Sequence, residues 1–242
     1  MDIKILPKIY LERSSSLLYA YLVVLPLFLL YELLIYIGQP SDQQVRISVD
    51  VWLKSLINLS GFDVLTATFL LVLTIGVVIL FMERKRLKEV QLSTFLLMHV
   101  ESIGYAVIMA AGVGFVIQGL FGLLQANTAV TELSFVDQFA LSLGAGLYEE
   151  LFFRVILVGL LFFLLKALFA KEWLAALIAA VIGALIFSAV HYVGNMGDLF
   201  TWQSFAFRAL AGLVLNGLYV LRGFGIAATT HAWYDVIVLL IL

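Results

Sequence analysis

Seven long apolar runs limit what this chain can fold into. A helix that crosses the hydrocarbon core of a bilayer needs about 20 mainly apolar residues, and each run approaches or exceeds that length. The runs are Leu17–Gly38, Phe62–Met82, Ile103–Leu124, Val136–Phe169, Trp173–Val193, Phe205–Leu221 and Phe224–Leu242. Of the 242 residues, 64% are hydrophobic and 12% are charged, whereas soluble domains hold about 45–50% apolar and about 25% charged residues. We therefore predict an all-α, polytopic membrane bundle of about seven to eight transmembrane helices.

Two segments between these runs are expected at the membrane surface. Val45–Gly61 mixes apolar residues with charges and favours an interfacial helix, and Glu89–Glu101 favours a second surface-lying or entry segment. The run Val136–Phe169 would be about 50 Å long as one α-helix, which exceeds the roughly 30 Å hydrocarbon core. It must tilt, protrude or break, and we expect flexure or close helix packing at Gly144 and Gly146.

The distribution of charges predicts the orientation of the chain in the membrane, and the absence of cysteine excludes several kinds of site. With seven spans, ten lysines and arginines fall on the side of the N-terminus and three on the other side. The positive-inside rule then predicts a cytoplasmic N-terminus and an outer C-terminus. The chain has no cysteine, which excludes disulfides, thiolate nucleophiles and cysteine-based metal sites. No basic footprint indicates a nucleic-acid partner, and no cleavage pattern of a removable signal follows the first run.

The stretch "GAGLYEELFFRVIL" places three charges inside an apolar run: Glu149, Glu150 and Arg154. A charge at the membrane centre costs about 2.5–3.5 kcal/mol on insertion scales, so the three need compensation or a purpose. On an α-helix, Glu150 and Arg154 are four residues apart and can form an ion pair. Glu149 is rotated by about 100° from Glu150 and has no local partner. A structural ion pair with Glu149 in a polar gap is the alternative to a functional site.

Two histidines follow on later spans. His191 stands at the end of one apolar run, and His231 is followed four residues later by Asp235 in "HAWYD". A lone histidine on a span is usually a packing residue, and we assign that role to His99, beside Glu101. Two histidines, an aspartate and an unpaired glutamate together favour a site.

Weaker polar candidates are Glu32, near the end of the first run, and Asn216, which suits a hydrogen bond between helices. No Gly-x-Ser-x-Gly, His-Glu-x-x-His or phosphate-binding motif is present. Glutamate and histidine could deprotonate a water for hydrolysis, and a second polar pair could stabilise an oxyanion. The same residues could hold zinc or line a path for a proton- or ion-coupled transporter.

The motifs "EELFFR", "FSAVH" and "HAWYD", in this order, resemble the CPBP family of CAAX-prenyl proteases and bacteriocin-processing enzymes, also called Abi. The resemblance covers roughly residues 140–236. It implies an intramembrane endopeptidase in which Glu149 and His191 activate water. His231 and Asp235 would contact the oxyanion, and Glu150 and Arg154 would form a supporting ion pair.

The resemblance also implies a glutamate-type mechanism without a cofactor. Many relatives carry asparagine where this chain has Asp235, and an ionised aspartate accepts but cannot donate hydrogen bonds. This departure keeps zinc as an alternative cofactor, held by Glu149, His191, His231 and Asp235. The expected partners are a membrane-associated polypeptide substrate and the lipid bilayer, and the expected location is a bacterial inner membrane. We treat residues 1–242 as one domain, with packing helices in 1–125 and the catalytic core in 126–242. The oligomeric state is not indicated.

Overall fold

The computed structural model describes residues 5–39, 44–121, 133–194 and 197–241, and within these ranges it is helical, with no strand. The α-helices are α1 (Ile5–Ser14), α2 (Leu17–Gly38), α3 (Ser48–Asn58), α4 (Val64–Met82), α5 (Leu92–Phe121), α6 (Phe135–Gly144), α7 (Gly159–Leu165), α8 (Glu172–Val190), α9 (Trp202–Arg222) and α10 (Phe224–Ile241). A 3₁₀-helix, η1 (Arg84–Glu89), precedes α5, and two π-helical segments, η3 (Ala145–Glu149) and η4 (Leu151–Val158), lie between α6 and α7.

Six helices in the described ranges are long and apolar enough to cross a membrane: α2, α4, α5, α8, α9 and α10. Five of them begin and end within about three residues of the apolar runs in the sequence. Polar side chains cap several of these helices. The side chain of Asp63 accepts a hydrogen bond from the amide of Thr66 at the start of α4, and the side chain of Thr201 accepts one from the amide of Ser204 at the start of α9. The predicted all-α, multi-pass membrane architecture is confirmed.

The segment Glu89–Glu101 is not separate from the apolar run that follows it. Most of this segment is the beginning of α5, which starts at Leu92 rather than near Ile103. The reason is a continuous buried stripe on one face of α5, which includes Thr94, Met98, Ser102, Ala106, Met109, Val113 and Ile117. The helix α1 was also not anticipated in the N-terminal segment.

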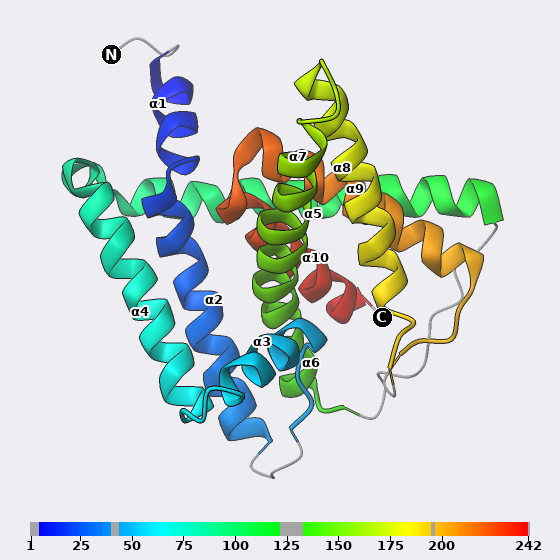
Figure 1. The fold of residues 1–242 in the computed structure, drawn as a ribbon, viewed down its shortest axis with the longest axis horizontal. Coiled ribbons are helices and arrows are strands. Elements are labelled where there is room, and N and C mark those ends of the chain that lie inside the picture. The colour runs from blue at the N-terminus through cyan, green and yellow to red at the C-terminus, as the bar shows by residue number, and fades with distance from the viewer. Residues whose placement is uncertain (1–4, 40–43, 122–132, 195–196, 242) are drawn as a thin grey trace.

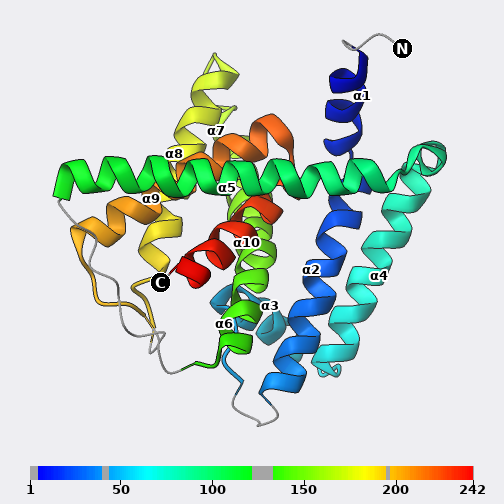
Figure 2. The ribbon, with the colours of Figure 1, turned by 180° about the vertical axis from the view of Figure 1, so that it is seen from behind.

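The helices do not all share one direction. Figure 1 shows α2 and α4 side by side, with the α6–α7 column in the middle of the molecule and α8 next to it. The long α5 crosses these helices, and α10 is inclined between α5 and the central column (Figures 1 and 2). The predicted helix in Val45–Gly61 is present as α3, which lies near one end of α2.

The central apolar run forms a continuous helix whose hydrogen-bonding pattern changes in its middle part. From Phe135 to Leu165 the chain is helical throughout, and its middle is π-helical. A π-helix closes hydrogen bonds over five residues rather than four, and such segments are frequent at functional sites. The amide of Gly159 donates to the carbonyl of Arg154, five residues earlier.

Small residues allow α10 to enter the bundle. The eight residues 225–232 are all buried. A Cβ atom on Gly225 would lie 2.8 Å from Cα of Ala20, and one on Gly146 would lie 2.5 Å from the carbonyl oxygen of Ala228. Glycine therefore permits the close contacts of α10 with α2 and with the central helix, which bring His231 into the interior. Close packing at Gly146 is as expected, and at Gly144 the ring of Tyr31 fills the place of a Cβ atom.

Candidate functional site

A buried ion pair forms the base of the site. Arg154 Nη1 lies 2.9 Å from Glu150 Oε1, and both residues are 0% exposed. The guanidinium carbon of Arg154 is 4.5 Å from the centre of the Phe187 ring, a cation–π contact. The Glu150 carboxylate and the Phe187 ring therefore both stabilise the positive charge of Arg154, which is shielded from water.

His231 approaches the same carboxylate from α10. Its Nδ1 donates to Glu150 Oε1 at 2.7 Å, and its Nε2 lies 3.7 Å from Oδ2 of Asp235, one turn further along α10. Glu150 thus contacts both Arg154 and His231, whereas the sequence suggested only Arg154. The bond to Glu150 fixes the orientation of the imidazole.

His191 comes from the end of α8. Its Nδ1 lies 2.8 Å from the carbonyl oxygen of Phe187. Because a carbonyl can only accept, Nδ1 carries the hydrogen, and Nε2 of the neutral ring has a free lone pair. The amide of Asp198 donates to the carbonyl of His191 at 2.9 Å, which holds the start of the following loop. His191 is therefore held in the tautomer that can accept a proton at Nε2.

Phe187 joins these parts. Its ring centre lies 4.9 Å from that of His191, 6.2 Å from that of His231 and 5.1 Å from that of Phe153. Together with the contact to Arg154, Phe187 touches groups from the central helix, α8 and α10. The sequence motif Phe-x-x-x-His contains this phenylalanine, but the pattern assigned it no role.

Glu149 is the least buried of the three charges in the central run. It is partly exposed, whereas Glu150 and Arg154 are fully buried. It is close enough to interact electrostatically with His191, His231 and Asp235. A partly exposed carboxylate beside two imidazoles can accept a hydrogen bond from water and take up its proton.

The structure brings all six predicted site residues into one region, although the motifs lie on three separate helices. The inclined α10 passes beside the central column (Figure 1), and its His231 bonds to Glu150. One assumption was wrong: the backbone that carries Glu149 and Arg154 is π-helical rather than α-helical. The ion pair four residues apart still forms, because both side chains are long enough to meet.

The other polar candidates have structural contacts. The indole of Trp233 donates to His99 Nδ1 at 3.2 Å, which agrees with a packing role for His99. Asn216 donates from α9 to the carbonyl of Ala180 on α8 at 2.8 Å, the expected bond between helices. Glu32 belongs to an ionic cluster with α3 and does not lie among the site residues.

A second polar group near His191, Arg208, was not indicated by the sequence. Arg208, on α9, donates to Tyr192 Oη at 2.8 Å and to Ser204 Oγ at 2.6 Å, and it forms an ion pair with Asp198. These contacts hold the loop that follows α8. Only the spacing of Arg208 from Ser204, one helical turn, could have suggested a part of this arrangement.

A metal site is not preformed by these residues. Among the described residues, no three histidine, aspartate or glutamate side chains lie close enough together to hold a metal ion. One nitrogen of each histidine is already engaged, that of His191 by a carbonyl and that of His231 by Glu150. Nε2 of each ring is left for water, substrate or a metal ion, and a zinc-bound imidazole ordinarily donates its other nitrogen to a carbonyl or carboxylate in this way.

Comparison with known proteins gives one match. Residues 131–237, a little under half of the chain, match the family model described as "Type II CAAX prenyl endopeptidase Rce1-like". No curated protein and no solved structure matches the chain. The matched segment contains every motif of the site, and the resemblance seen in the sequence is confirmed. Residues 131–237 are therefore similar to a family of membrane endopeptidases.

Proposed function

We propose that this protein is a glutamate-dependent intramembrane endopeptidase that hydrolyses a peptide bond of a membrane-associated polypeptide. The observation that carries the proposal is the convergence on Phe187, around which Arg154, His191 and His231 gather from three helices. The match to an endopeptidase family model supports the same reaction class. We also propose a bacterial inner membrane as its location, and the distribution of basic residues favours a cytoplasmic N-terminus.

Glu149 and His191 are the proposed pair that activates water. A water hydrogen-bonded between the Glu149 carboxylate and Nε2 of His191 would lose a proton to Glu149 as its oxygen attacks the scissile carbonyl carbon. When the C–N bond breaks, the leaving amine takes that proton back from Glu149. The hydrogen bond from His191 Nδ1 to the Phe187 carbonyl supports this role, because it leaves Nε2 free to accept.

His231 and Asp235 are the proposed pair for the oxyanion. Since His231 Nδ1 donates to Glu150, only Nε2 can face the substrate oxygen. Nε2 donates a hydrogen bond only when the ring is an imidazolium, and Glu150 and Asp235 lie on either side of that ring. Asp235 then acts by orienting His231, since an ionised carboxylate would repel an oxyanion.

The test is Glu149→Gln in membranes, with Glu89→Gln as the control on an exposed glutamate. Loss of a general base lowers the rate by about 10²–10⁴-fold, so polypeptides should accumulate uncut with Glu149→Gln and not with Glu89→Gln. The family description makes a prenylated CAAX peptide the first substrate to try, with prepeptides and sorting tails as the next classes. If no cofactor takes part, metal analysis of the purified protein should find no bound metal, and chelator treatment should leave cleavage unchanged.

Full cleavage by Glu149→Gln would disprove the proposal. Ion flux in liposomes without any peptide cleavage would favour the transporter instead, because intramembrane carboxylates and histidines also line ion pathways. Loss of cleavage on chelation, restored by zinc, would replace the metal-free mechanism by a zinc-dependent one.

A further inference from the structure

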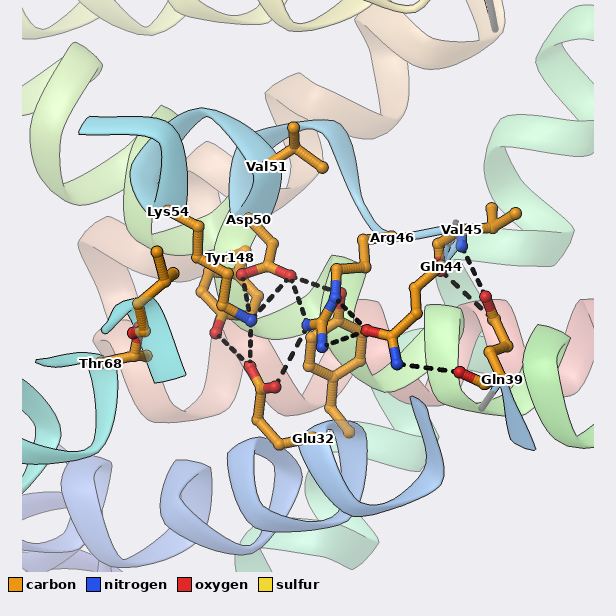
Figure 3. A network of polar contacts seen from close by, with 12 residues as sticks. Glu32, Gln39, Gln44, Val45, Arg46, Asp50, Val51, Lys54, Thr68 and Tyr148 are labelled. Carbon is orange, nitrogen blue, oxygen red and sulfur yellow. Dashed lines mark hydrogen bonds and ion pairs between the residues drawn. The ribbon is translucent and has the colours of Figure 1, made fainter. Parts of the chain in front are cut away.

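A buried ionic cluster lies outside the segment that matches the family. It consists of Glu32 on α2, Arg46 before α3, and Asp50 and Lys54 on α3, and we call it the α2–α3 cluster (Figure 3). Arg46 Nη1 is 3.1 Å from Glu32 and 3.0 Å from Asp50, and Lys54 Nζ is 2.5 Å from Glu32 and 2.9 Å from Asp50. Two positive and two negative groups therefore balance in a region that excludes most water.

Stability alone does not account for this cluster. Glu32 is 4% exposed and Asp50 is 0% exposed. Burial by itself would lower the pKa of Arg46, but the carboxylates of Glu32 and Asp50 outweigh it and raise that pKa. Replacing buried ion pairs by apolar side chains is often neutral or stabilising. A role in fixing the position of a neighbouring group is therefore a better explanation.

The neighbouring group is Tyr148. Figure 3 shows its side chain pointing into the cluster, where its hydroxyl donates to Glu32 Oε1 at 3.1 Å. Its ring packs edge-to-face on Tyr31, with centres 5.5 Å apart, and Lys54 Nζ lies 5.9 Å from its ring centre. Tyr31 in turn donates to Asp50 at 2.8 Å. Tyr148 is buried and immediately precedes Glu149 in the chain.

The same helix is held at two further points. Gly144 packs so closely on α2 that a Cβ atom there would lie 2.5 Å from the ring of Tyr31. Gly146 packs against Ala232 of α10, where a Cβ atom would lie 2.6 Å from the Cβ atom of Ala232. Residues 144–148 are thus packed tightly against α2 and α10, and Glu149 is the next residue. In a rigid helix, the direction of one side chain sets that of its neighbour.

We propose that Tyr148 is a positioning residue: the α2–α3 cluster holds its hydroxyl and so aims the Glu149 carboxylate at His191. This inference rests on the proposed function of Glu149. It connects a cluster in the first 60 residues to the chemistry of a segment that begins 70 residues later. Tyr148 acts through Glu149 and need not touch the substrate.

The test uses three variants: Tyr148→Phe, Glu32→Gln and the double variant that combines these two changes. Each is compared with the control Tyr21→Phe. Tyr21 is the matched control, because its hydroxyl also donates to one oxygen, that of Val72, but on the side of α2 that faces α4. The probe is a prenylated CAAX peptide, the first substrate class to try. Tyr148→Phe should lower kcat about tenfold, equivalent to about 1.4 kcal/mol, with KM unchanged, and Tyr21→Phe should leave both unchanged.

Glu32→Gln should also lower kcat, because an amide oxygen is a weaker acceptor than a carboxylate, and the double variant should be about as active as Tyr148→Phe alone, because both changes act on the same hydrogen bond. Amide hydrogen exchange in residues 144–158 should be faster in Tyr148→Phe than in Tyr21→Phe. Glu32→Gln serves as the second variant if Tyr148→Phe does not fold.

The outcomes separate the two proposals. If Glu149→Gln abolishes cleavage while Tyr148→Phe keeps the wild-type kcat, or changes only KM, the positioning role is overturned and the proposed function stands. Independent, multiplying effects of the two single changes would also overturn it. If Glu149→Gln cleaves normally, the proposed function fails, and unaltered hydrogen exchange in Tyr148→Phe would then overturn the anchoring of this helix as well.

Discussion

Replacing Arg154 by methionine should destabilise the bundle more than any change to an exposed arginine. Methionine retains most of the apolar stem but removes the guanidinium, which lies 2.9 Å from Glu150 and 4.5 Å from the ring centre of Phe187. Glu150 is 0% exposed, and no described residue forms a hydrogen bond with its Oε2. Within the described part of the chain, the carboxylate would keep only His231 as a partner, so a charge would remain buried and poorly compensated. Breaking a buried pair in this way costs about 3–5 kcal/mol.

The assay is unfolding of the purified protein in mixed micelles by a denaturing detergent, followed by circular dichroism. The matched control is Arg86→Met. Arg86 lies 4.0 Å from Glu12, and the two side chains are 39% and 67% exposed. An exposed pair of this kind contributes about 0–1 kcal/mol. Adding Glu150→Gln to Arg154→Met should recover part of the loss, because it removes the stranded charge.

Equal losses of unfolding free energy for Arg154→Met and Arg86→Met would refute the reasoning. So would a Glu150→Gln/Arg154→Met double variant whose loss is the sum of the two single losses. Either result would mean that the buried carboxylate does not depend on the guanidinium.

Two further predictions follow from packing and from charge. Gly146→Ala should lower the unfolding free energy by about 1–3 kcal/mol through overpacking against α10, whereas Gly104→Ala, whose Cβ atom would meet nothing within 4 Å, should be neutral or stabilising; equal effects in the same detergent assay would contradict the close contact. Since the chain has no cysteine, single cysteines report topology: an impermeant maleimide added to intact cells should label Ser60→Cys and not Ser15→Cys, and the reverse pattern would exclude a cytoplasmic N-terminus.

The spanning helices could be predicted because long apolar runs leave little choice. In hydrocarbon every backbone amide must be satisfied within the segment, so an apolar run of sufficient length becomes a helix. The beginning of α5 was missed because His99 and Glu101 look like residues of a membrane surface. In the structure these polar groups have partners on other helices, Trp233 for His99 and Arg222 for Glu101. Such partners cannot be read from the local sequence.

The motifs predicted residues that the structure brings together, but not the contacts between them. The spacing of Glu150 and Arg154 indicated an ion pair, since neighbours four residues apart on a helix meet. The bond from His231 to Glu150 joins residues 81 positions apart, and no pattern of spacing contains it. The π-helical winding was also hidden, because residue preferences do not distinguish it from an α-helix in an apolar run.

The case of Glu32 shows why a lone carboxylate in a sequence is hard to interpret. Its partners Arg46 and Lys54 lie in a connection and on a short helix whose charges resemble an exposed face. Folding places α3 against the central helix, and the charges become internal because each has an opposite charge within about hydrogen-bond distance. An ionised group enters a low-dielectric interior only with such a partner. It follows that the α2–α3 cluster contacts the matched segment at Tyr148, the residue before Glu149. A division of the chain into packing helices and a catalytic core would separate Glu149 from the contacts that fix the helix carrying it.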